Sequence, residues 1–175
     1  IKVNGRLKFK NYMEDGYQDF YATLDDFKLH ANLYFPEVRL REFIEIRNHD
    51  CVNKNMLYSL LAFYKGIFYS EDALNEVDAI LSNFTYQDLS ELRYDVPKLA
   101  LQSVVNGLPI KDVCRELMRI SYVSLNEALN NEEIYLEPIM EFVEAGVSPA
   151  DVILLNWNGL WKKDINKLMR YLKSA

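Results

Sequence analysis

Hydrophobic residues recur at helical spacing through most of this 175-residue chain. From Asn55 onward the pattern is almost entirely helical, because apolar positions repeat three and four residues apart. Residues 56–68 are apolar nearly all round, which indicates a helix that is buried on several sides. Ser70, Thr85 and Ser148 each stand where a capping residue precedes a further helix. The pattern therefore predicts a mainly helical protein.

Proline and glycine divide the helical region into separate elements. One helix is predicted to end near Arg93, and the next to begin with Pro97 in its first turn and to stop at Gly107. Pro109 then opens the longest predicted helix. The remaining predictions are helices at 110–129, at 132–145 with a kink at Pro138 and a cap at Gly146, at 148–158, and at 161–173.

A strand is predicted at 40–47, where β-branched and aromatic residues follow a loop that Pro36 keeps out of the helical conformation. Side chains alternate along a strand. One face would carry Arg41, Phe43, Glu45 and Arg47, and the other Glu42, Ile44 and Ile46. A charged face has no reason to pack into an apolar core, so we expect Arg41, Glu45 and Arg47 to point toward solvent or a cleft.

The start of the chain is ambiguous. Leu7 to Phe9 fits either a short strand or the lead into a helix around 9–14, and Thr23 is predicted to cap a helix that continues through His30. A lone strand cannot satisfy its own backbone donors and acceptors. The strand at 40–47 must therefore pair with an N-terminal strand within 1–20, with another copy, or with a missing part of the protein.

These patterns predict a mainly α (α+β) fold, a helical array with one main strand. The length suits a single domain, 1–175, with a strand-bearing segment at 1–54 and a helical region at 55–175. The first residues are neither an initiator methionine nor a signal peptide, so we expect an excised piece of a longer protein.

Composition narrows the possible partners. The chain carries 20 basic and 26 acidic residues, and no stretch is densely basic, which argues against a nucleic-acid partner. No apolar run reaches the roughly 18 residues that a membrane span needs. Cys51 and Cys114 cannot form a disulfide framework, so a reduced pair in the cytoplasm is expected.

The charged face of the strand is the main chemical candidate. A carboxylate such as Glu45 suits a hard divalent cation, and the guanidinium groups of Arg41 and Arg47 suit a phosphate. The alternative is a solvated face with cross-strand ion pairs.

Other candidate sites have weaker support. His49 and Cys51 offer two soft ligands, but structural zinc needs four, and residues two apart rarely meet as base and nucleophile. His30 is interpreted as a packing residue.

The run FPEVRLREFIEIRNHD, residues 35–50, resembles the signature of the glutamate–cysteine ligases of the plant and proteobacterial group. A histidine-bearing segment, LHANLYF, leads into it as in that family. Two later segments are similar to further family motifs, SLLAFYKGIFYS and EAGVSPADVILLNWNGLWKKDI. The matching segments occur in the same order, so the resemblance covers most of the chain.

The resemblance implies the C-terminal part of a ligase with a glutamine-synthetase-like fold, whose site lies on the concave face of an antiparallel sheet. It implies an ATP-dependent reaction in which the side-chain carboxylate of glutamate is phosphorylated and the amine of cysteine then displaces phosphate. ATP and Mg²⁺ would be needed, and glutamate, cysteine and the missing N-terminal part of the enzyme would be the partners. This piece is expected to be inactive alone.

Roles for individual residues follow from the same resemblance. Glu45 would bind magnesium, and Arg47 would contact the transferring phosphate. Arg39 and Arg41 would lie near nucleotide phosphate or a substrate carboxylate, with Arg41 joining Arg47 in catalysis. Glu37 and Asp50 would support them, Asp50 by orienting Arg47.

The chain departs from the family pattern at several positions. Asn48 and His49 replace a glycine and an alanine, and the following helix carries Leu61, Tyr64 and Lys65 in place of proline, tryptophan and valine. These changes leave two alternatives open. One is a related carboxylate–amine ligase with another acceptor amine, and the other is a non-catalytic helical interaction domain.

Overall fold

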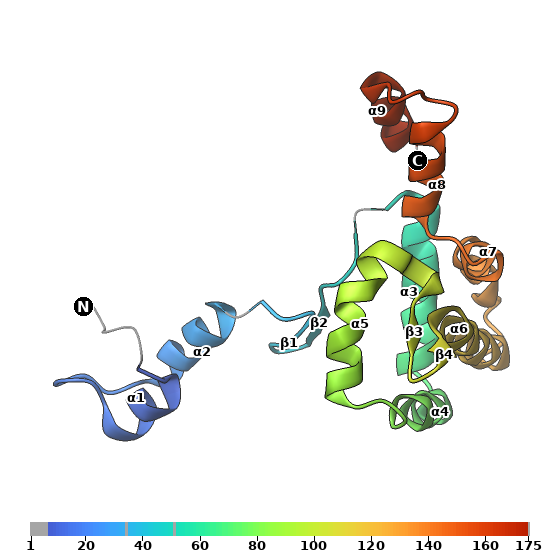
Figure 1. Ribbon diagram of the computed structural model, residues 1–175. Helices are drawn as coiled ribbons and strands as arrows, with labels where there is room; N and C mark the ends of the chain where they lie inside the picture. The colour runs from blue at the N-terminus through green and yellow to red at the C-terminus, as the bar shows by residue number, and fades with distance from the viewer. Residues whose placement is uncertain (1–6, 34, 51, 175) are drawn as a thin grey trace. The chain divides into compact units, whose positions relative to one another are not determined.

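The computed structural model describes residues 7–33, 35–50 and 52–174. The chain divides into two compact units, Ile1–Cys51 and Val52–Ala175. The described parts are mainly α-helical with two small two-stranded sheets, as the hydrophobic pattern predicts (Figure 1). The proposed single domain with segments 1–54 and 55–175 stays a prediction.

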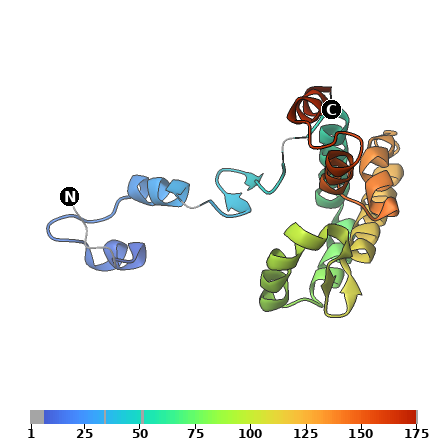
Figure 2. The same cartoon turned by 45° about the horizontal axis from the view of Figure 1, so that its top comes forward.

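The first unit begins with two short helices, α1 (Phe9–Asp15) and α2 (Leu24–Leu33), seen also in Figure 2. Thr23 caps α2 as predicted, since its Oγ1 accepts a hydrogen bond from the backbone N–H of Asp26 at 3.2 Å. His30 stacks on the Phe9 ring with centroids 4.2 Å apart. This contact supports the interpretation of His30 as a packing residue.

A β-hairpin follows α2, and it corrects the predicted strand at 40–47. The chain forms β1 (Val38–Leu40) and β2 (Ile44–Ile46), which pair antiparallel across a bend at 41–43. The partner strand is therefore the segment immediately upstream and not a segment within 1–20. The bend contains no glycine, asparagine or proline, which are the residues typical of hairpin turns. The sequence therefore predicted one continuous strand where the structure has two strands and a bend.

The register of the hairpin separates its residues into two faces. Arg39 pairs with Glu45, whereas Val38 pairs with Ile46 and Leu40 with Ile44. Directly paired residues share a face, so one face is charged and the other is apolar. The apolar face is open to solvent, with Leu40 77% and Ile44 68% exposed. A two-stranded hairpin of this kind is at best marginally stable by itself.

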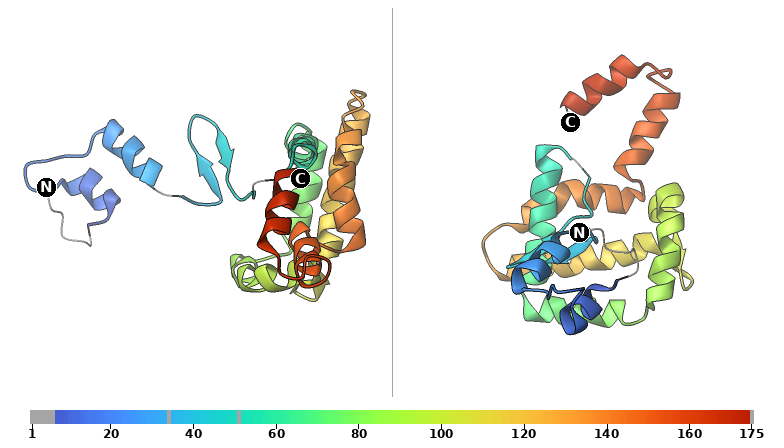
Figure 3. Two further views of the ribbon diagram at one scale, coloured as in Figure 1. Left: turned by 90° about the horizontal axis from the view of Figure 1, so that it is seen from above. Right: turned by 90° about the vertical axis from the view of Figure 1, so that its left-hand side faces the viewer.

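The second unit is built from helices around α3, as Figure 3 shows from two further sides. Three helices of this unit begin at a capping residue that the sequence predicts, namely Ser70, Thr85 and Ser148, and the last two form capping boxes with Asp88 and Asp151. The elements are α3 (Lys54–Phe68), α4 (Glu71–Leu81), α5 (Tyr86–Leu99), η1 (Ala100–Gln102), β3 (Val104–Val105), β4 (Leu108–Pro109), α6 (Ile110–Glu127), η2 (Glu133–Leu136), α7 (Glu137–Ala145), α8 (Pro149–Asn158) and α9 (Ile165–Ser174).

The predicted helix from Pro97 to Gly107 is wrong. Pro97 lies inside the last turn of α5, where only one intrahelical hydrogen bond is lost before the helix ends at Leu99. Asn106 and Gly107 then adopt φ values of 50° and 78°. A two-residue turn with positive φ at both central residues is a common connection between antiparallel strands. Asn106 and Gly107 form such a turn between β3 and β4.

The core of the second unit lies where α3 crosses α6. Leu125, Leu136 and Ala62 are buried there, and Leu136 is fully enclosed. Gly66 of α3 lies directly against the backbone of Ser121 on α6, and the Ser121 hydroxyl donates to the carbonyl of Phe63 at 3.0 Å. The close approach of the two backbones depends on the missing side chain at Gly66.

The helical region ends with α8 and α9. The predicted helix at 161–173 starts later, at Ile165, because Lys162 and Lys163 adopt positive φ. Trp161 packs on Tyr171 of α9 at 5.2 Å between ring centroids, which holds the turn before α9 against that helix. Within the described part of the chain, no helix is both long enough and apolar enough to cross a membrane.

Candidate functional site

The charged face of the hairpin is centred on Glu45. Its Oε2 accepts a hydrogen bond from Nε of Arg39 at 2.9 Å and forms an ion pair with a terminal guanidinium nitrogen of Arg39 at 2.7 Å. A guanidinium nitrogen of Arg47 lies 3.8 Å from the other carboxylate oxygen. The Arg39 side chain is only 11% exposed, whereas Glu45 and Arg47 are about one-third exposed, at 31% and 29%. One carboxylate therefore lies between two guanidinium groups.

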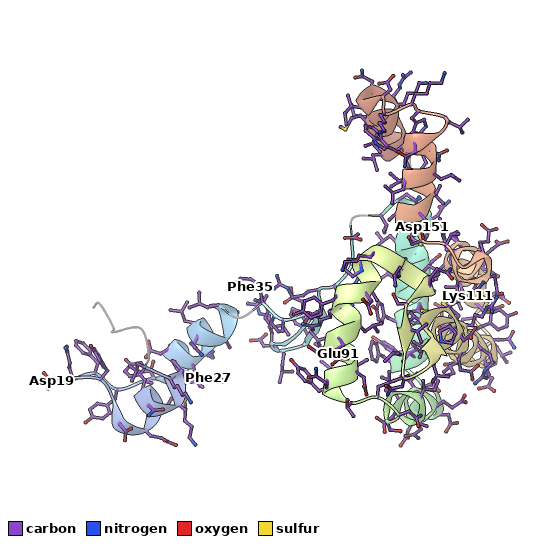
Figure 4. All side chains as sticks on the ribbon, in the orientation of Figure 1. Asp19, Phe27, Phe35, Glu91, Lys111 and Asp151 are labelled. Carbon is purple, nitrogen blue, oxygen red and sulfur yellow. The ribbon has the colours of Figure 1, made fainter. Side chains whose placement is uncertain are left out.

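Phe35 supports both arginines. The Arg47 guanidinium lies 4.7 Å from the centroid of the Phe35 ring, and that of Arg39 lies 5.6 Å from it. Figure 4 labels Phe35 where the chain leaves α2 for β1. A cation over an aromatic face is attracted by the ring, so Phe35 holds the two guanidinium groups close together. The predicted site did not include this residue.

The backbone fixes Arg47 and Arg41 differently. The N–H of Arg47 donates to the carbonyl of Glu37 at 2.8 Å, which extends the hairpin pairing by one step. Arg41 lies in the bend, so the strand alternation that placed it beside Glu45 is broken, although its charge still acts on Glu45. Arg41 is exposed, and the side chains of Glu45 and Arg47 are about one-third exposed. That all three point away from the helical core stays a prediction.

The structure thus brings together Arg39, Glu45 and Arg47, with Arg41 and Glu37 nearby in the same hairpin. Asp50 lies exposed beyond β2, and within the described residues it forms no ion pair with Arg47. Cys51 lies outside the described residues, so the structure does not test the weakly supported alternative of a site at His49 and Cys51. No group of three or more His, Cys, Asp or Glu side chains suited to a metal occurs within 7–33, 35–50 and 52–174.

A hollow adjoins the charged face. It measures 330 Å³ and lies between α2 and β1, with Phe27, Pro36 and Arg39 among its lining residues. The guanidinium of Arg39 also lies 3.4 Å from the backbone carbonyl of Asn32 in α2. Arg39 therefore connects the end of α2 to the strand that carries the site.

The arginines lower the pKa of the Glu45 carboxyl below its ordinary value of 4.5. The main cause is the hydrogen bond from Arg39, which outweighs the opposing effect of burial, and the charges of Arg39, Arg47 and Arg41 add to it. The resulting stabilisation of the hairpin is present above pH 4.5 and is lost as the pH falls through the lowered pKa.

A carbon-detected NMR titration of the Glu45 carboxyl is expected to give a midpoint below 4.5. Arg39→Gln removes the strongest hydrogen bond and should move that midpoint back toward the ordinary value. A midpoint at or above 4.5 in the unaltered chain would mean that the ion pair does not form in solution.

A second polar cluster, in the second unit, was not predicted as a site. The ammonium of Lys65 on α3 bonds to both carboxylate oxygens of Glu132, at 2.7 Å and 2.5 Å. The two residues are 67 positions apart, so no local pattern pairs them. The only signal in the sequence was that Lys65 replaces a valine of the similar family segment.

Comparisons with known proteins identify glutamate–cysteine ligases as relatives of this chain. Residues 5–170 match the family model described as glutamate-cysteine ligase family 2. The chain is 30% identical to the chloroplastic glutamate–cysteine ligase of Nicotiana tabacum over 152 residues, which is 87% of the chain and 29% of that protein. It is 28% identical to the protein of the same name from Solanum lycopersicum over 169 residues, 95% of the chain and 32% of that protein. The chain therefore spans less than a third of the length of these relatives.

Proposed function

The chain belongs to the glutamate–cysteine ligase family 2, and from that membership we propose that it forms part of an ATP-dependent ligase that makes γ-glutamylcysteine. In the proposed reaction the γ-carboxylate of glutamate attacks the terminal phosphorus of ATP, and ADP leaves. The amine of cysteine then attacks the acyl carbon, loses a proton, and displaces inorganic phosphate. The observation that carries the proposal is the joint position of Arg39, Glu45 and Arg47 on one face of the hairpin.

The residues of this chain contribute charge and position and form no covalent bond to the substrates. The guanidinium of Arg47, partly exposed and held over Phe35, offers planar donors to a transferring phosphoryl group. Arg41, in the exposed bend, can follow the same negative charge. Arg39 is the most enclosed of the three, and we assign it to a nucleotide phosphate or a substrate carboxylate beside the hollow. Phosphoryl transfer depends mainly on such positioning and electrostatic stabilisation.

The donor set of the hairpin fits magnesium in part. Glu45 presents the oxygen that faces Arg47, and Mg²⁺ is commonly held by one or two carboxylates together with phosphates and water. When bound, the ion would neutralise phosphate charge during the transfer. The described residues form no group of three or more His, Cys, Asp or Glu side chains suited to a metal, and we propose that the remaining ligands come from another part of a longer protein.

A related ligase with a different acceptor amine is the second candidate. The observation that favours it is the pair Asn48 and His49, which follows the site directly and replaces small residues of the similar family segment.

The relatives are named as chloroplastic proteins. For this chain we propose a reducing compartment such as the cytoplasm, since Cys114 is a free, partly buried thiol.

The test is an assay of the longer protein that contains this chain, with glutamate, cysteine and ATP–Mg²⁺. We expect γ-glutamylcysteine and phosphate to form together and both to require all three substrates. The 175-residue chain alone is expected to form no product and to bind ATP–Mg²⁺ no better than about 1 mM, because it supplies too few metal ligands.

Two results would contradict the proposal. Turnover with another amine but none with cysteine would favour the second candidate. Robust turnover by the 175-residue chain would show that its own residues are sufficient for the reaction.

A further inference from the structure

A second hollow lies in the helical unit, against one face of α3. It measures 440 Å³ and is lined by Tyr58, Leu61, Ala62, Lys65, Glu132 and Tyr135. The four α3 residues are spaced three and four positions apart, so they form one stripe along the helix. Glu132 immediately precedes η2, and Tyr135 lies within it. A volume of this size is within the range of small-molecule sites in proteins.

The walls of the hollow are fixed to one another. The hydroxyl of Ser59, a fully buried residue, donates to the backbone carbonyl of Tyr135 at 2.6 Å. Leu136, next in the chain, is fully enclosed in the core. A hydrogen bond between α3 and η2, together with this buried anchor, holds the two sides of the hollow at a constant separation.

The hollow combines two tyrosine rings with one positive and one negative group. The rings of Tyr58 and Tyr135 lie 6.0 Å apart between centroids at an angle of 56°. The side chains of Lys65 and Glu132 bond to each other, but they keep 41% and 31% of their surface open to solvent. Both charged ends are thus accessible to a ligand that enters beside the rings.

This arrangement selects a ligand by its charges. A simple carboxylate would bind Lys65 but would leave Glu132 without a partner, and a simple amine would do the reverse. A ligand that carries a carboxylate and an ammonium on the same carbon can pair with both at once. Its apolar side chain would then lie against the two phenol rings and Leu61.

We propose that this hollow binds a free α-amino acid with an aromatic or branched apolar side chain. Lys65 receives the α-carboxylate, and Glu132 receives the α-ammonium. The inference does not rest on the ligase reaction, since all lining residues belong to the second unit and the binding requires neither ATP nor turnover.

Isothermal titration calorimetry of the chain with L-phenylalanine and L-leucine tests the proposal. We expect saturable binding with a dissociation constant of about 1 mM, which is reasonable for ligands of this size. The two matched probes are 3-phenylpropionate, which lacks the ammonium, and phenethylamine, which lacks the carboxylate. Each is expected to bind about tenfold or more weakly, because one charged hydrogen bond is lost.

Variants locate the binding. Lys65→Met keeps the aliphatic stem and removes the charge, and Glu132→Gln keeps the shape of its side chain. Both are expected to weaken L-phenylalanine binding about tenfold or more. The matched control is Arg115→Gln, which breaks a half-exposed ion pair with Glu144 away from the hollow and should leave binding unchanged. Circular dichroism confirms that each variant is folded before it is titrated.

Three results would overturn the proposal. One is the absence of saturable binding by either amino acid at 20-fold the expected constant, that is, about 20 mM. Another is equal binding of all three phenyl compounds, which would make the hollow merely hydrophobic. The third is unchanged affinity in folded Lys65→Met, which would place the ligand elsewhere on the chain.

Discussion

Replacing Glu45 by glutamine in the longer protein is expected to lower its turnover about a hundredfold or more, the usual cost of losing one electrostatic stabiliser. Glutamine keeps an oxygen that can accept the Arg39 hydrogen bond, so the hairpin should retain its geometry. What disappears is the negative charge between Arg39 and Arg47, and with it the proposed magnesium ligand. The measurement is phosphate release with glutamate, cysteine and ATP at saturating concentrations.

A matched control exists on α6. Glu116 also accepts a hydrogen bond from an arginine, Arg119, and this bond likewise lowers its pKa. Glu116→Gln removes an ion-paired carboxylate of the same kind in the second unit and should leave turnover within about twofold, as surface ion pairs contribute little. Unchanged turnover in Glu45→Gln would remove Glu45 from the site, and equal losses in both variants would indicate a general structural effect.

Replacing Gly66 by alanine is expected to destabilise the chain by about 2 kcal/mol, as overpacking at a close contact does. A Cβ at this position would lie 2.6 Å from the carbonyl oxygen and 2.9 Å from the Cα of Ser121. Both are backbone atoms, so relief requires α3 and α6 to separate. Separation would open the core around Leu125 and Met118, which are buried beside this crossing.

The sign of the effect distinguishes two physical causes. Helix propensity alone favours alanine over glycine inside a helix by about 1 kcal/mol, so a free helix would be stabilised. The close contact with Ser121 instead predicts that Gly66→Ala lowers the free energy of unfolding. Urea unfolding followed by circular dichroism measures the difference, and Gly66→Val should show a larger loss because valine is bulkier. A neutral or stabilising Gly66→Ala would mean that the helices can move apart at little cost.

The helix starts were the most predictable part of the fold. Thr85 and Ser148 are each followed three residues later by an aspartate, and both pairs form the reciprocal hydrogen bonds of a capping box. Such signals are local, because the residues involved are neighbours in the chain. Pro97 was misassigned because a proline is compatible both with the last turn of one helix and with the first turn of the next. The sequence near Pro97 does not distinguish these two positions.

The hairpin was only half predictable. The strand predicted at 40–47 includes β2, and it placed Glu45 and Arg47 on one face, where their charged groups lie 3.8 Å apart. Arg39 was assigned to the site by resemblance, but its pairing with Glu45 depends on a bend at 41–43 that has no typical turn residue. The position of Phe35 beneath two guanidinium groups follows from the register and could not be read before the strands were paired.

Thermal unfolding of this chain is expected to reflect mainly its second unit. None of the described residues of the first unit is buried, and among all described residues the buried hydrophobic ones lie between Met56 and Val143. The heat-capacity change and the enthalpy of a calorimetric transition arise largely from surface that unfolding exposes. A melting temperature measured on this chain therefore describes the helical unit. Substitutions in the hairpin are therefore expected to leave the melting temperature unchanged even where they abolish the proposed activity, so a thermal screen alone would not detect them.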